Sequence, residues 1–254
     1  MGDVLAGNHA VWEFESDSVL IRFARGMRTP RLWHALGPRR IPFEALTGVT
    51  VTDTAGRRDP VVLYAAPRAG ADPLMEAASG QLKEACDPYR LVLPADRAEQ
   101  ATAFAEALRA RLGPEAAEPA DRFLVEVPRP PVHFKAYDAR VDFDGSTITF
   151  QWSRTGATST KWKAGDQRYP LAALSDIEWV SPDRPGGGHL RLLLRDGEGN
   201  TAAGSATDPR PDHDLTAVVF GAGVGVGSGG VHQALPLAAA VLAGLKGSVR
   251  LRGA

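Results

Sequence analysis

The sequence predicts a mainly β protein made of two tandem modules, each of about seven short strands closed by one C-terminal α-helix. Two observations predict it. The heptapeptide RIPFEAL at residues 40–46 returns as RYPLAAL at residues 168–174, which is 128 positions later. Short runs of alternating apolar residues are separated by turn residues, and each set of runs ends in a stretch with helical spacing. We therefore expect domain 1 at residues 1–112, a Pro/Ala-rich linker at 113–131 and domain 2 at 132–254.

The repeat extends on both sides of this heptapeptide. Residues 14–23 (FESDSVLIRF) lie over residues 143–152 (FDGSTITFQW), and both predict a strand, a tight turn and a second strand. Further blocks agree in order and in type, which is a much stronger signal than agreement of a single block. These blocks are residues 48–51 over 176–179, 61–64 over 189–194, 89–93 over 216–220, and the helical stretches 96–112 and 231–245.

In the first module the strands are expected to form hairpins, and residues 24–39 are expected to be an arginine-rich loop or irregular strand. Pro42 marks an edge strand or the start of a strand, because proline cannot donate to a ladder. Residues 71–86 form an insertion with a short helix predicted at 73–78. The predicted hairpins pair residues 11–14 with 19–23 and residues 49–52 with 61–65.

The linker and the second closing helix carry their own signals. Residues 123–127 alternate in polarity and predict a strand within the linker. The second closing helix is expected to end at Gly247, with a frayed basic tail after it. Residues 225–230 match the pattern GxGxxG, but no acidic residue follows Asp214 to hold a ribose. This stretch is therefore predicted to be a flexible loop rather than a dinucleotide site.

A succession of short strands closed by one amphipathic helix is the pleckstrin-homology-like (PH-like) arrangement, in which the helix covers an open end of a barrel. The chain also resembles a domain-of-unknown-function family that is common in streptomycete actinobacteria and whose members carry tandem PH-like modules. The resemblance covers nearly the whole chain and implies two PH-like barrels; it comes with no assigned chemistry and therefore gives no catalytic residues to carry over. It is carried by GNHAVWEF at residues 7–14, RRIPFEAL at 39–46, DPYRLVL at 87–93 and KWKAGD at 161–166.

Composition narrows the class of protein. The 254 residues carry a net charge of −1, which argues against a nucleic-acid binder, since such proteins are usually strongly basic. Cys86 is the only cysteine and no hydrophobic leader begins the chain, so a reducing, cytoplasmic location is expected, with peripheral attachment at the inner face of the membrane as the alternative. The longest apolar run without charge, residues 234–245, is too short to span a bilayer.

Basic residues gather at the same place in both modules, in stretches 22–40 and 154–168. Arginine binds phosphate oxygens in bidentate fashion, so these stretches are candidates for an anion-binding patch. The alternative is that they are solvated charges that protect sheet edges from pairing. Trp33 and Trp162 lie within the stretches and are candidates for a contact with a protein partner or for a position at a membrane interface. The candidate anion-binding residues are Arg25, Arg28, Arg31, Arg39, Arg40, Lys161, Lys163 and Arg168.

The sequence contains no pattern typical of catalysis, of a cofactor or of a metal site. No nucleophile motif, phosphate-binding loop or set of zinc cysteines is present, and Asp212-His213-Asp214 lacks a paired metal-ligand spacing. We therefore expect a non-enzymatic binding or scaffold protein that engages a protein partner through exposed sheet edges or a face formed by the modules. The alternative is peripheral binding to anionic lipid or to a phosphorylated ligand through the two basic stretches.

Overall fold

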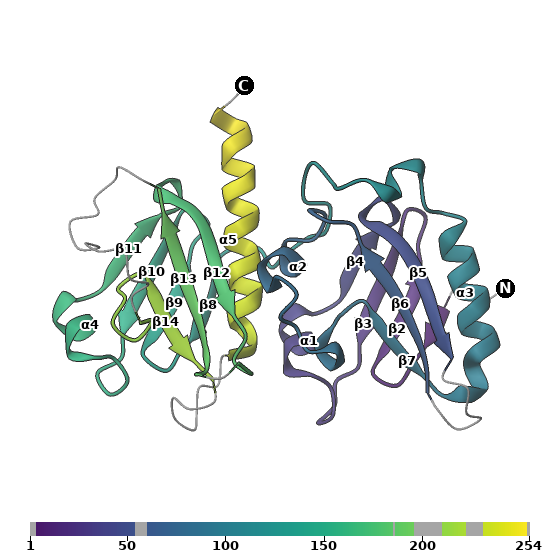
Figure 1. Cartoon of the computed structure of the whole chain (residues 1–254), viewed down its shortest axis with the longest axis horizontal. Helices are drawn as coiled ribbons and strands as arrows, with labels where there is room; N and C mark the ends of the chain where they lie inside the picture. Colours follow the sequence, from purple (N-terminus) through teal and green to yellow (C-terminus); the bar gives the residue numbers. More distant parts are fainter. Residues whose placement is uncertain (1–3, 54–59, 185, 196–209, 222–230, 253–254) are drawn as a thin grey trace. The chain divides into compact units, whose positions relative to one another are not determined.

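A computed structural model describes residues 4–53, 60–184, 186–195, 210–221 and 231–252 (Figure 1). The chain forms two compact units. The first unit comprises residues 1–72 and 82–126, and the second unit comprises residues 73–81 and 127–254. Each unit is mainly β and ends in a helix, which confirms the two repeated halves expected from the sequence.

In the described part of the first unit, antiparallel strands form a four-stranded sheet in the order β1-β2-β3-β4 and a three-stranded sheet in the order β5-β6-β7. Helix α3 packs against β5 and β6 (Figure 1). The elements are β1 (Val4–Ala6), β2 (Ala10–Phe14), β3 (Ser18–Phe23), α1 (Arg31–Leu36), β4 (Arg39–Pro42), the 3-10 turn η1 (Phe43–Ala45), β5 (Leu46–Asp53), β6 (Val61–Pro67), η2 (Glu84–Cys86), β7 (Arg90–Leu93), η3 (Ala95–Arg97), α3 (Ala98–Arg109) and η4 (Pro114–Ala117).

The described part of the second unit has the same plan, with a four-stranded sheet in the order β11-β10-β9-β8 and a three-stranded sheet in the order β12-β13-β14. Helix α5 packs against β8 and β12. The elements are α2 (Pro73–Ala78), β8 (Val132–Lys135), β9 (Ala139–Phe143), β10 (Thr147–Trp152), α4 (Ser159–Ala164), β11 (Gln167–Pro170), η5 (Leu171–Ala173), β12 (Leu174–Val180), β13 (Gly188–Leu194), β14 (Ala217–Phe220) and α5 (Val231–Arg252).

The repeated heptapeptide lies where each unit passes from one sheet to the other. Pro42 and Pro170 are the last residues of β4 and β11, and each is followed by a 3-10 turn. Because proline lacks the N–H that would continue the ladder, the strand ends there and the turn redirects the chain into the next sheet. The prediction of closed barrels is therefore wrong, because in the described residues of each unit the two sheets are separate.

The two closing helices differ in how much of their surface is covered. In α3 the buried residues Ala101, Phe104, Ala105 and Leu108 form the single apolar stripe expected from their spacing. In α5 every residue from 234 to 241 is buried. A helix that is buried on all sides needs neighbours on more than one side, and here α2 packs on α5 in addition to β8 and β12.

Three local predictions were wrong. The first basic stretch contains helix α1 at Arg31–Leu36 in place of a loop. Gly247 does not end the second closing helix, which continues to Arg252, since a helix tolerates an interior glycine at a cost of about 1 kcal/mol. Residues 123–127 form no strand, because Leu124 N and Val125 N both donate to the carbonyl of Ala71 and not to a ladder.

Two further predictions concern the linker and the glycine-rich stretch. Of the predicted linker, residues 113–126 lie in the first unit and residues 127–131 lie in the second unit. The GxGxxG stretch at 225–230 lies outside the described residues. Within the described part of the chain, no helix is long and apolar enough to cross a membrane.

The short helix predicted at residues 73–78 is confirmed as α2, but it belongs to the second unit and not to the first. Its buried residues are Pro73, Leu74, Ala77 and Ala78. Ser79 (φ 47°) and Gly80 (φ 69°) adopt left-handed conformations directly after the helix. This conformation ends a helix and turns the chain sharply, here toward Gln81.

We predict that Leu74→Ala destabilises the second unit by about 2–5 kcal/mol, because it removes a fully buried side chain from the α2 contact. Hydrogen-exchange mass spectrometry should show faster exchange in β12 and α5, with β2 and β3 unchanged. The matched control is Leu91→Ala, whose side chain is equally buried but lies on β7 of the first unit. Faster exchange in β2 and β3 of the Leu74 variant would contradict the assignment.

Candidate functional site

Arg39 does not belong to the predicted anion-binding patch, because it is buried in an ion pair. Its Nη2 lies 2.7 Å from Oδ2 of Asp72, and the hydroxyl of Tyr89 donates to the same oxygen at 2.8 Å. Burial is the largest single effect and lowers the pKa of Arg39, but the charges of Asp72 and Tyr89 and the hydrogen bonds to both together outweigh it, so the pKa is raised overall. Burial also raises the pKa of Tyr89 well above its ordinary value. Arg39 therefore acts within the core of the first unit.

Lys161 is also removed from the predicted patch, since its side chain is fully buried. Its ammonium donates to Oδ2 of Asp138 (2.7 Å) and to the carbonyls of Pro211 (2.7 Å) and Ala217 (2.8 Å). An ammonium has three protons, so these bonds leave none for an external anion. Burial lowers the pKa of Lys161 and raises that of Asp138, while their mutual attraction opposes both shifts.

Trp33 occupies the position equivalent to Lys161 in the repeat and plays an equivalent part. It is buried, its Nε1 donates to the carbonyl of Cys86 at 2.8 Å, and its ring stacks on Phe23. In both units this position fastens the short helix, α1 or α4, to the segment before the last strand. The prediction of Trp33 as a surface contact is therefore wrong, whereas Trp162 is exposed.

Five of the eight candidate residues remain as exposed cations without an ion pair to any residue that the structure describes: Arg25, Arg28, Arg31, Lys163 and Arg168.

The sixth exposed candidate, Arg40, forms an ion pair with Glu15. The basic stretches are thus sorted by the fold into buried cations that bind internal acids and exposed cations that face solvent.

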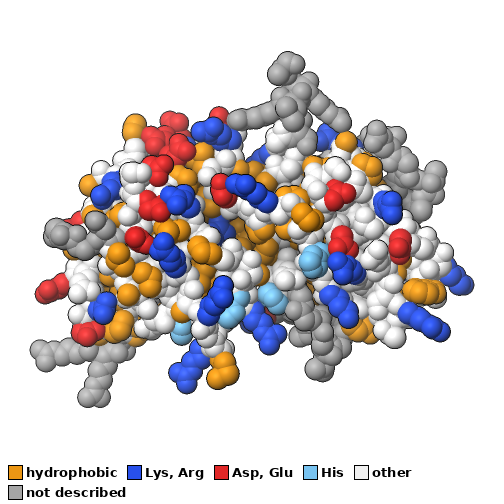
Figure 2. All heavy atoms as spheres, turned by 180° about the vertical axis from the view of Figure 1, so that it is seen from behind, with side chains coloured by type: hydrophobic (Ala, Val, Ile, Leu, Met, Phe, Trp, Pro, Cys, Tyr) orange, Lys and Arg blue, Asp and Glu red, His pale blue; other side chains and the backbone are white. Residues whose placement is uncertain are grey.

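An exposed apolar side chain accompanies the free cations in each unit. Met27 is 105% exposed and lies between Arg25 and Arg28, and Trp162 is 51% exposed and precedes Lys163. Met27 lies in the segment between β3 and β4, and Trp162 lies in the segment between β10 and β11, which are the third and fourth strands of each four-stranded sheet in chain order. Figure 2 shows basic side chains together with a projecting hydrophobic one at the lower edge of the face it draws.

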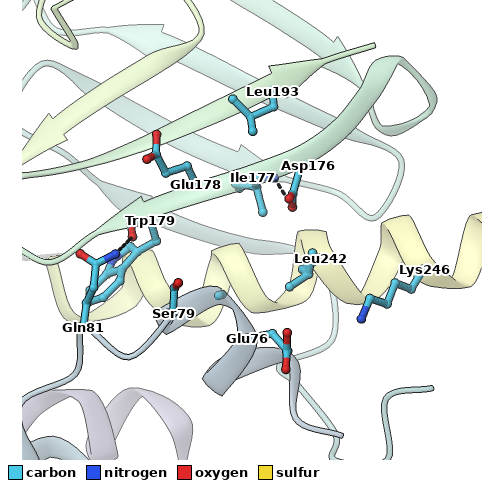
Figure 3. A pocket seen from close by; sticks show the side chains of 11 residues that line it. Glu76, Ser79, Gln81, Asp176, Ile177, Glu178, Trp179, Leu193, Leu242 and Lys246 are labelled. Carbon is cyan, nitrogen blue, oxygen red and sulfur yellow. Dashed lines mark hydrogen bonds between the residues drawn. The ribbon is translucent and has the colours of Figure 1, made fainter. Parts of the chain in front are cut away.

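The second unit also contains a groove of about 400 Å³ beside β12 (Figure 3). Figure 3 shows β12 along one side, α2 along the other and α5 between them. Gln81, directly after α2, bridges to the end of β12: its Nε2 donates to Trp179 O, and its Oε1 accepts from Ser181 N, each at 3.2 Å. The lining residues are Glu76, Ala77, Ser79, Gln81, Asp176, Ile177, Glu178, Trp179, Leu193, Leu242 and Lys246.

The acid-rich segment considered for metal binding is part of a turn. Asp214 Oδ1 accepts from the backbone N–H and the hydroxyl of Thr216, both at 2.8 Å, and Asp212 forms an ion pair with Arg210. Among the residues that the structure describes, no group of three or more His, Cys, Asp or Glu side chains is placed to hold a metal ion.

Two segments of the chain, residues 12–109 and 141–242, match the family described as Domain of unknown function (DUF4429). The chain belongs to the DUF4429 family. The first match runs from β2 to the end of α3 and the second from β9 into α5, so the DUF4429 segment corresponds to one copy of the repeat. The first DUF4429 segment also contains residues 73–81, which fold with the second unit. A search of curated proteins finds no match.

Sequence reasoning missed Asp72 and Asp138, the buried acids that form ion pairs with the candidate cations Arg39 and Lys161. It also missed the groove along β12. The two acids lie 33 and 23 positions from Arg39 and Lys161, so no local pattern links them. A usable signal was present only for the groove, because Gln81 follows the predicted helix at 73–78 within the insertion.

We predict that Lys161→Met destabilises the protein by about 3–5 kcal/mol, because it leaves the carboxylate of Asp138 buried without its partner. Urea denaturation of the purified chain measures the change. The control is Lys163→Met on the same helix, which removes an exposed charge and should change stability by less than about 0.5 kcal/mol. Equal effects of the two substitutions would contradict the structural role of Lys161.

Proposed function

We propose that this DUF4429 protein is a non-enzymatic binding protein with two PH-like modules. Each module is proposed to attach to an anionic membrane surface through the segment between the third and fourth strands of its four-stranded sheet. The PH-like assignment is supported by the element order, in which a four-stranded sheet is followed by a three-stranded sheet and a closing helix.

The observation that carries this proposal is the exposed apolar side chain flanked by unpaired cations. A thioether such as that of Met27 loses contact with water when it enters the headgroup region, and an indole such as that of Trp162 favours the same depth. Each Lys or Arg near an anionic bilayer contributes about 1 kcal/mol of attraction. Arg25, Arg28 and Lys163 stand beside these apolar groups and carry charges that no described acid neutralises.

The buried charges support a role in binding rather than in catalysis. Arg39 and Lys161 each form an ion pair with a carboxylate inside a core. Groups with shifted pKa values mark active sites when they converge on a cleft, but these lie in the packed interior of their units. Repetition of a weak membrane contact adds avidity, since the second attachment is intramolecular once the first is made.

The test is sedimentation with vesicles of phosphatidylcholine, with and without phosphatidylserine. We expect binding only to the anionic vesicles, decreasing as salt is added. Arg28→Glu/Arg31→Glu should weaken it more than about tenfold, because two attractive charges become repulsive. Met27→Ser should weaken binding while leaving the net charge unchanged.

The control for charge is Arg122→Glu/Lys135→Glu, which reverses two exposed cations outside the proposed segments. This variant should sediment like the unmodified protein. Equal loss in both double variants would show that only net charge matters, and absence of binding to any vesicle would refute attachment to membranes.

A further inference from the structure

The outer edge of β12 is defined by the register of its sheet. Leu192 N donates to Thr216 O at 2.9 Å, so the backbone groups of Leu192 lie on the β14 side of β13. Backbone groups alternate sides along a strand, and those of Arg191 therefore point to β12, where Arg191 pairs with Glu178. The residues on either side of Glu178 must then point their N–H and C=O groups away from β13, toward the groove.

Gln81 uses this edge as a neighbouring strand would. Its carboxamide donates to Trp179 O and accepts from Ser181 N, the two outward groups that flank Val180. In a parallel ladder one residue bonds in this way to the carbonyl before its partner and to the N–H after it. The side chain of Gln81 thus takes the place of one residue of an added strand (Figure 3).

The next position along the edge is open. Opposite Glu178, the corresponding groups are Ile177 O and Trp179 N, and neither bonds to any residue in the described part of the chain. The remaining outward donor, Ile177 N, is bonded to Oδ1 of Asp176 at 2.8 Å. The free pair has the spacing that a parallel strand uses, and it lies where β12 lines the groove.

The walls of the groove define the chemistry of an occupant. Asp176 and Glu178 alternate with Ile177 along β12, α2 adds Glu76, and α5 contributes Leu242 and Lys246, so the walls carry three acids and one base. Oε2 of Glu178 also lies 3.6 Å from Nη1 of Arg191 on β13. Side chains alternate between faces of a strand, so an added strand would place one set beside the two carboxylates and the other set against the apolar wall. Cationic side chains match the first set and aliphatic side chains match the second.

We propose that this groove binds an extended segment of a partner protein with alternating basic and aliphatic residues, which adds to the three-stranded sheet as a strand parallel to β12. Backbone bonds to Ile177 O and Trp179 N would hold the segment, and the carboxylates of Asp176 and Glu178 would select its charge. This inference concerns a different surface from the membrane proposal and does not depend on it.

The test uses the full chain and a fluorescent hexapeptide of sequence Lys-Val-Lys-Val-Lys-Val, measured by fluorescence anisotropy. Two control peptides separate the contributions. Glu-Val-Glu-Val-Glu-Val has the wrong charge, and the first peptide with N-methylated backbone amides at its lysines keeps the charge but cannot donate from the residues that would lie opposite Asp176 and Glu178. We expect the first peptide to bind at least tenfold more tightly than either control. Asp176→Asn/Glu178→Gln should weaken its binding at least tenfold.

A second readout is independent of variants. Hydrogen exchange of the unmodified protein should show protection of the Trp179 amide when the first peptide is bound. Absence of binding would overturn the proposal, as would equal binding of the N-methylated peptide or an unprotected Trp179 amide. Binding of the peptide with no loss in the Asp176/Glu178 double variant would overturn the assigned charge selection.

Discussion

Each unit depends on one buried donor, at the same position of the repeat, that fastens the segment between the third and fourth strands. In the first unit Trp33 donates to the carbonyl of Cys86, and in the second Lys161 donates to two carbonyls and to Asp138. The donors differ in charge because only Lys161 has a carboxylate beside it. A buried ammonium requires such a partner, whereas an indole requires only one acceptor.

The attachment of this segment to the core decides which of its cations are buried and which stay exposed. In the first unit Arg39 turns inward to Asp72 while its neighbour Arg40 stays at the surface, because successive residues of a strand point to opposite faces. The remaining cations are left in solvent beside Met27 or Trp162. Arg39 and Lys161 form ion pairs with buried acids inside the core. The surface proposed to contact a membrane therefore consists of the cations of these segments that remain exposed.

A segment of the first repeat copy covers part of an unpaired sheet edge in the second unit. Among the described residues, β12 has no neighbouring strand on its outer side, and an unpaired edge invites pairing with other chains. The segment of α2 and Gln81 occupies part of that edge, while Asp176 bonds to the outward N–H of Ile177. Partial protection leaves a short free stretch within a groove, which is suited to selective pairing rather than to general aggregation.

The amino-acid sequence alone determined the duplication, the order of strands and closing helices, and the short helix at 73–78, because these follow from local periodicity, turns and repeated motifs. It gave Trp33 and Trp162 the same role, although only Trp162 is exposed. Only the tertiary structure decided that Arg39, Lys161 and Trp33 are buried, since their partners Asp72, Asp138 and Cys86 are distant in the chain. The same holds for α2, whose own sequence indicates a helix with a buried face, while the surface that covers this face is formed by residues more than ninety positions away.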